Sequence, residues 1–286
     1  MSFTNDSTSR DGTLGGGRDS GGAGSGPGGD GNAPALPPRT LSLVAAVAAL
    51  AGVVVYAVGL PESIGLFGSP LSDLTLPAAL LVFFVTTVVA SVMVTRAPWR
   101  VVDIVVASVL GVAGGLVFAV WNAFAWEPIS GALAFFPPAS AILVGVWLLP
   151  GVLGGLVIRK PGAAVYTELV AATLSALIGN QWGFATVWYG LLEGLGAEVV
   201  FALLLYRAFG WPTALLAGAG AGVTVGVLDS LLYYPTFSAG YKLAYVGLAV
   251  VSGVVIAGLG SWALTRAMAR SGALAPLPSG RVTERV

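Results

Sequence analysis

The stretch Ile158–Arg207 reads IRKPGAAVYTELVAATLSALIGNQWGFATVWYGLLEGLGAEVVFALLLYR and decides the fold class. It consists of two apolar legs joined by a polar and aromatic turn, Gly179–Gly183, with basic residues at both ends. Each leg is close to the ~20 residues that an α-helix needs to cross the hydrocarbon core of a bilayer. The stretch therefore predicts a transmembrane helical hairpin with ionisable groups inside it. Its three acids are Glu168, Glu193 and Glu198.

Composition supports a membrane protein and excludes several classes of chemistry. The chain is 56% hydrophobic and 9% charged, with a mean hydropathy of +0.90, which is not the composition of a soluble domain. Its formal net charge is zero, so no basic surface favours a nucleic-acid partner. Cysteine and histidine are absent, which removes thiolate chemistry, the commonest general base and the commonest transition-metal ligand. We expect no enzyme activity, no cofactor and no metal site.

Eight transmembrane helices are expected in an all-α fold. Residues 1–40 are rich in glycine and have little apolar surface to bury, so they are predicted to be a disordered cytoplasmic tail. Residues 41–98 are predicted to form two additional helices, 99–268 a six-helix substrate-binding domain, and 269–286 a cytoplasmic C-terminal tail. The predicted helices span about 41–59, 74–95, 99–126, 139–158, 163–178, 184–206, 212–232 and 243–267.

Lysine and arginine placement predicts the orientation of these helices. If the N-terminus is cytoplasmic, twelve of the thirteen basic residues fall on the cytoplasmic side and only Lys242 falls outside. This asymmetry follows the positive-inside rule. The sequence therefore predicts a multi-pass protein of the plasma membrane with both termini in the cytoplasm.

Polar and aromatic side chains gather at the outer ends of the predicted helices. An interfacial aromatic belt is the alternative explanation for any single tryptophan or tyrosine, but a belt does not require amides and an acid. Glu193 lies roughly 14 Å into its helix, where an acid is costly unless it is paired or faces a water-filled cavity. The alternative for Glu193 is an interhelical hydrogen bond or ion pair. The predicted substrate-binding residues are Trp121, Asn122, Trp126, Asn180, Gln181, Trp182, Trp188, Glu193, Asp229 and Tyr233.

The chemistry of this residue set suits a flat, partly cationic heterocycle. Aromatic rings stack on such a ligand, a carboxylate attracts its charge, and amides bind ring nitrogens and hydroxyls. Glu168 and Glu198 are predicted to be structural instead, because Arg159, Lys160 or Arg207 can reach them from the inner face. The predicted site offers ligand binding and no nucleophile–base pair.

A stripe of small residues lies on the first helix of the six-helix block. Ala107, Gly111 and Gly115 recur at four-residue spacing, which lets another helix approach closely. The approaching helix belongs either to the same bundle or to a partner protein. Both alternatives stay open on spacing alone.

From about residue 99 to 268 the sequence resembles the YkoE family, the substrate-capture (S) components of energy-coupling-factor (ECF) transporters for thiamine or hydroxymethylpyrimidine. The resemblance implies a six-helix membrane protein that binds a vitamin at its outer face. It also implies a transmembrane coupling (T) subunit and a pair of ABC ATPases as partners, with Ala107, Gly111 and Gly115 as the contact with the T subunit. The residues that carry it are Ile158–Ala164, Glu168, Gly179–Gly183, Gly190–Glu198, Phe201 and Arg207.

Other functions remain as alternatives. The first is an S component for another small heterocyclic vitamin, and cobalt or nickel capture is disfavoured because such sites prefer histidine. The second is an intramembrane enzyme that pairs Glu193 with Asp229, but helical rise places these acids roughly 7 to 10 Å apart in depth. The third is a structural membrane protein, whose outer aromatic and amide residues would enclose no cavity.

Overall fold

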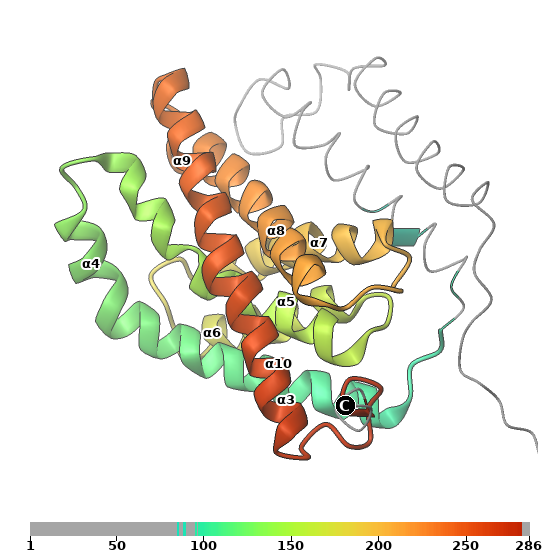
Figure 1. Cartoon of the computed structure of the whole chain (residues 1–286). Helices are drawn as coiled ribbons and strands as arrows, with labels where there is room; N and C mark the ends of the chain where they lie inside the picture. Colours follow the sequence, from blue (N-terminus) through green and yellow to red (C-terminus); the bar gives the residue numbers. More distant parts are fainter. Residues whose placement is uncertain (1–84, 86–87, 90–94, 96, 282–286) are drawn as a thin grey trace, which may run out of the picture. The chain divides into compact units, whose positions relative to one another are not determined.

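Six apolar segments of the described chain form a helical bundle (Figure 1). The computed structural model describes Val85, Val88, Val89, Thr95 and residues 97–281, which belong to one compact unit. The predicted tail, residues 1–40, lies outside the described residues, as do nearly all of the two additional helices predicted within 41–98. The eight-helix count therefore stays a prediction.

Several of the segments combine more than one type of helix. Five are long and apolar enough to cross a membrane within the described residues, and α6 is a shorter apolar helix. The all-helical membrane fold is thus confirmed. The segments are α3 (Val101–Val120) with the π-helical turn η2 (Trp121–Ala125) and α4 (Trp126–Ala132); the 3-10 helix η3 (Pro137–Leu143) and α5 (Gly145–Ile158); α6 (Ala163–Ile178); α7 (Ala185–Leu203); α8 (Trp211–Leu232); and α9 (Ala239–Ser252), the π-helical turn η4 (Gly253–Leu259) and α10 (Gly260–Arg270).

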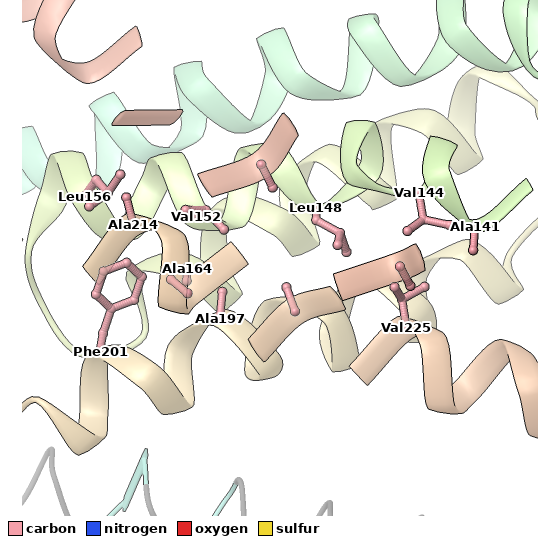
Figure 2. Packing of buried hydrophobic residues seen from close by; sticks show 14 of the residues in the cluster. Ala141, Val144, Leu148, Val152, Leu156, Ala164, Ala197, Phe201, Ala214 and Val225 are labelled. Carbon is pink, nitrogen blue, oxygen red and sulfur yellow. The ribbon is translucent and has the colours of Figure 1, made fainter. Parts of the chain in front are cut away.

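Small residues hold the helices at close range. Lipid tails are as apolar as leucine, so helices in a membrane associate through tight packing rather than through a hydrophobic driving force. A Cβ added at Gly218 of α8 would lie 2.2 Å from the Gly253 carbonyl oxygen of η4. The central apolar cluster is rich in alanine and valine for the same reason, and Figure 2 shows Ala164, Ala197 and Ala214 close to the larger Phe201.

The small-residue stripe of α3 packs against α6. Ala107, Gly111 and Gly115 are all buried. A Cβ at Gly111 would lie 2.7 Å from the Val170 Cβ, and one at Gly115 would lie 2.8 Å from the Ala171 carbonyl oxygen. The structure therefore uses the stripe within the bundle. Within the described structure α6 covers Gly111 and Gly115, and Ala107 packs in the apolar cluster that includes Leu153 and Leu277.

Ion pairs and indole contacts join the start of α3 to the α5–α6 turn. Asp103, whose side chain has no exposed area, receives Lys160 at 2.6 Å and Arg100 at 3.0 Å. The Trp99 indole donates a hydrogen bond to the Pro161 carbonyl at 2.9 Å. The hydrogen bond from Arg100 to Asp103 is the main reason why the pKa of Arg100 is raised. Lys160 is thus bound to Asp103 and not to Glu168 or Glu198.

Glu198 stabilises the N-terminus of α6. Its carboxylate accepts backbone N–H groups from Gly162 and Ala164, both at 2.7 Å, and the Tyr206 hydroxyl at 2.5 Å. A carboxylate at the first turn satisfies N–H groups that have no partner within the helix and interacts favourably with the helix dipole. The structural role predicted for Glu198 therefore rests on a helix N-terminus rather than on a basic side chain.

The predicted C-terminal tail packs against the bundle as far as residue 280. Leu274 and Leu277 are 2% and 0% exposed, and they join Ala107, Val157 and Ile158 in a second apolar cluster. This cluster lies where α3 begins and α5 ends. The segment after α10 is thus part of the folded unit.

Candidate functional site

A cavity of about 330 Å³ opens where α3, α4, α5, α6, α7, α8 and α9 meet. It lies at the end of the bundle that contains η2, the α6–α7 turn and the α8–α9 turn, which we call the pocket end. The lining residues are Phe118, Asn122, Trp126, Glu127, Trp147, Ala172, Gln181, Trp182, Thr186, Tyr189, Glu193, Val225, Asp229, Tyr233, Tyr234 and Tyr245.

Three tryptophans form one wall of the cavity. Trp126 contacts Trp147 and Trp182 edge-to-face, with ring centroids 4.8 Å and 5.8 Å apart, and the Trp147 and Trp182 centroids are 5.5 Å apart. The Trp147 indole donates a hydrogen bond to the Asn122 side-chain oxygen at 3.0 Å. Asn122 belongs to the π-helical turn η2, and such turns are frequent at functional sites. Asn122 is 8% exposed, so the turn presents a buried amide beside the indole rings.

Tyrosine hydroxyls and two carboxyl groups belong to the polar part of the cavity lining. The Tyr245 hydroxyl of α9 donates a hydrogen bond to Asp229 Oδ2 at 2.7 Å. The rings of Tyr189 and Tyr233 have centroids 5.4 Å apart. Glu193 and Asp229 are 7% and 9% exposed, so both carboxyl groups are largely removed from solvent. The described residues that line the cavity include no lysine or arginine.

Glu193 and Asp229 share this cavity despite the difference in depth predicted from helical rise. The depth estimate counts residues along an ideal helix axis and ignores helix tilt and the reach of a side chain. Glycines also bring the neighbouring helix close to Glu193, since a Cβ at Gly190 would lie 2.4 Å from the Ala172 Cβ. The predicted difference in depth, which disfavoured a direct carboxylate pair, does not prevent the two acids from lining one cavity.

Comparison with known proteins shows the family of this chain. It is 33% identical over 184 residues to the HMP/thiamine permease protein YkoE of Bacillus subtilis, covering 64% of this chain and 91% of that protein. A solved structure described as the crystal structure of an S-component of ECF transporter matches with a TM-score of 0.61 and 31% identity, over 66% of this chain and 94% of the other. Residues 102–224 also match the family model "ABC-type cobalt transport system, permease component".

The chain belongs to the YkoE family.

Membership in the YkoE family confirms the class that the sequence motifs predicted. The chain is an S component of ECF-transporter type, a multi-pass membrane protein, and a transport component rather than an enzyme. S components of this type act with a substrate and with transmembrane and ATPase partners in general. The cavity is therefore the candidate substrate site of a YkoE-family transport component.

Seven of the ten predicted substrate-binding residues line the cavity, and Trp121, Asn180 and Trp188 do not. Trp121 packs edge-on against Trp147, with centroids 6.5 Å apart. Trp188 is 65% exposed on the outside of α7. The seven residues are Asn122, Trp126, Gln181, Trp182, Glu193, Asp229 and Tyr233.

Asn180 holds the α6–α7 turn instead of lining the cavity. Its side-chain oxygen accepts the Trp182 backbone N–H at 2.9 Å and the Thr186 hydroxyl at 3.1 Å. Its amide nitrogen donates to the Ser175 hydroxyl at 3.1 Å. Gly179 and Gly183 flank the turn with φ values of 103° and 59°, a region that favours glycine. Asn180 therefore positions Trp182 rather than a ligand.

Several lining residues escaped the predicted set. Trp147 lies inside a long apolar run, where nothing local distinguishes it from a core residue. Tyr189 and Phe118 carry a weak signal, because each is four residues from a predicted site residue and so lies on the same helix face as Glu193 and Asn122, respectively. Glu127, Thr186, Tyr234 and Tyr245 complete the missed polar residues.

Proposed function

We propose that this chain captures thiamine or hydroxymethylpyrimidine at the outer face of the plasma membrane. The pocket end faces outward, as the distribution of lysine and arginine predicts. Both termini are then cytoplasmic. A T subunit and an ABC ATPase pair drive release of the ligand inward. The chain itself contains no P-loop motif, so ATP hydrolysis belongs to the partners.

One observation carries the proposal: a tryptophan wall and two buried carboxyl groups line the same cavity, without a lysine or arginine among the described lining residues. Indole faces attract flat rings and cations, and a carboxylate in a dry site attracts a cation strongly. Thiamine combines an aminopyrimidine ring with a permanently cationic thiazolium ring. The name of the Bacillus subtilis relative, an HMP/thiamine permease, supports the same ligand class.

Another small heterocyclic vitamin is the alternative ligand, because the same wall and carboxyl groups suit any flat cationic ring. Cobalt, which the matching family model names, suits the cavity less well. The chain has neither histidine nor cysteine, and no group of three or more acidic side chains in the described residues is placed to hold a metal ion. Such ions prefer nitrogen and sulfur ligands in proteins.

A binding titration with the purified full chain tests the proposal. Thiamine and hydroxymethylpyrimidine are titrated separately while tryptophan fluorescence is recorded, since three indoles line the cavity. Saturable quenching at micromolar ligand is the expected result. A different heterocyclic vitamin that binds while both of these compounds fail would move the proposal to that vitamin. Absence of binding by every compound of this class would contradict it.

A further inference from the structure

Glu193 is a buried carboxyl group that faces the cavity and has no hydrogen-bond or ion-pair partner among the described residues. It lines the cavity and is 7% exposed. Within the part of the chain that the structure describes, no group donates a hydrogen bond to its oxygens and no cation pairs with it. A buried polar group in this condition either binds something from the cavity or is held in its neutral form.

Asp229 stands in a different environment within the same cavity. Its Oδ2 accepts a hydrogen bond of 2.7 Å from the Tyr245 hydroxyl. A donor of this kind stabilises the ionised form of a carboxylate. Of the two acids that share the cavity, Asp229 is therefore the better placed to carry a negative charge, and Glu193 is the better placed to carry a proton.

No lysine or arginine among the described residues that line the cavity favours ionisation of Glu193. The other titratable side chains that surround it are the acids Glu127, Glu168 and Asp229 and the hydroxyls of Tyr189, Tyr233, Tyr234 and Tyr245. Glu168 is on α6, behind the cavity wall, and its Cβ would lie 3.1 Å from a Cβ at Gly194. Glu168 is fully buried, and one of its oxygens has no hydrogen-bond partner among the described residues.

Charge repulsion and desolvation determine whether both acids of the empty cavity can be ionised. Two like charges that share a poorly solvated site repel each other, and desolvation opposes the second charge further. A cationic ligand reverses both effects, because its charge replaces the missing counter-ion. A neutral ligand of similar shape does not.

We propose that Glu193 is protonated in the empty pocket and releases its proton when a cationic ligand binds beside it. The proposal rests on the function proposed above. It states in addition that binding of a cationic ligand is coupled to the release of one proton. The O–H bond of the Glu193 carboxyl group breaks, the proton passes to a buffer base in solution, and the carboxylate pairs with the bound cation. Glu193 thus distinguishes thiamine from hydroxymethylpyrimidine by charge.

Titration calorimetry in buffers of different ionisation enthalpy measures the released proton. The full chain is titrated at about pH 7 with thiamine and with hydroxymethylpyrimidine, which share the aminopyrimidine ring but differ in the thiazolium charge. Thiamine is expected to release close to one more proton than hydroxymethylpyrimidine. Linkage then requires thiamine affinity to fall about tenfold for each unit of pH below 7, relative to the affinity for hydroxymethylpyrimidine.

Two variants assign the proton. Glu193→Gln keeps the size of the side chain and is expected to abolish the extra proton release, while its binding of hydroxymethylpyrimidine shows that it is folded. Trp188→Ala, which changes an exposed residue outside the cavity lining, is expected to leave the proton count unchanged.

Three outcomes overturn the proposal. If thiamine binds with no more proton release than hydroxymethylpyrimidine, the proton exchange is wrong and the ligand assignment stands. If Glu193→Gln binds both compounds and still releases the extra proton with thiamine, the assignment to Glu193 is wrong. Failure of both compounds to bind the unmodified chain would overturn the proton exchange together with the proposed function.

Discussion

Trp182 and Trp188 lie six residues apart and have opposite surroundings. Trp182 lines the cavity and contacts Trp126 and Trp147, whereas Trp188 is 65% exposed on the outside of α7. The substitution Trp182→Ala should weaken thiamine binding about tenfold, because stacking and cation–π contacts contribute about 1–2 kcal/mol. Equilibrium titration measures the change. Trp188→Ala is the matched control, and equal losses in the two variants would show that the wall does not contact the ligand.

Tyr245 supplies the hydrogen bond that Asp229 receives in the bundle. The substitution Tyr245→Phe keeps the ring but leaves Asp229 Oδ2 without this donor, which should cost about 1–3 kcal/mol of stability. Thermal unfolding in detergent measures the loss. Tyr241→Phe removes a hydroxyl from a tyrosine that is 42% exposed on the same helix, α9. A smaller loss for Tyr245→Phe than for Tyr241→Phe would contradict the role assigned to the hydroxyl.

The close packing of α8 against η4 requires glycine at position 218. A Cβ at Gly218 would lie 2.2 Å from the Gly253 carbonyl oxygen and 2.8 Å from the Gly258 nitrogen, and backbone atoms cannot turn aside as a side chain can. Gly218→Ala should therefore destabilise the bundle by about 1–3 kcal/mol. Gly247→Ala on α9 is the control, since nothing lies within 4 Å of its added Cβ. Similar unfolding temperatures for both variants would show that the two elements are not packed as described.

The N-terminus of α6 depends on a carboxylate from α7. Glu198→Gln retains the shape of the side chain but replaces one acceptor oxygen with a donor, which then faces the N–H groups of Gly162 or Ala164. We expect a loss of about 1–3 kcal/mol of stability. Thermal unfolding measures it, with Glu127→Gln as the exposed control. An unchanged unfolding temperature would mean that water satisfies this helix end as well as the carboxylate does.

The orientation of the whole molecule can be tested because the chain has no cysteine. Ala134→Cys places a thiol on an exposed residue at the pocket end, and Ser271→Cys places one at the opposite end, after α10. In intact cells, a membrane-impermeant maleimide should label Ala134→Cys and should label Ser271→Cys only after permeabilisation. The reverse pattern would place the pocket on the cytoplasmic side.

Sequence reasoning located the bundle segments well and located the cavity in part. Apolar run length and chain breaks such as Pro137-Pro138 report on local structure, so the six segments predicted from residue 99 onward coincide with the described helices to within a few residues at most ends. Membership of the cavity depends on side-chain direction. An amide in a turn suits either a ligand or the turn itself, and Asn180 is bound to the turn.

Helix tilt and helix pairing cannot be predicted from local sequence patterns either, because they depend on contacts between distant parts of the chain. Spacing alone does not say which helix covers the stripe of Gly111 and Gly115, and the structure places α6 there. Counting residues along ideal helices gives the depths of Glu193 and Asp229 but not whether their side chains face one cavity, which both of them line. Trp147 gave no signal in the sequence because its tertiary neighbours, rather than its neighbours in the chain, make it part of the tryptophan wall.

A structure of the full chain with bound thiamine tests the central claim most directly. The account predicts that the aminopyrimidine and thiazolium rings lie in the cavity, against Trp126 or Trp182, with the thiazolium charge beside Glu193 or Asp229. Thiamine bound elsewhere on the chain, or bound in the cavity with its cationic ring turned away from both acids, would contradict it.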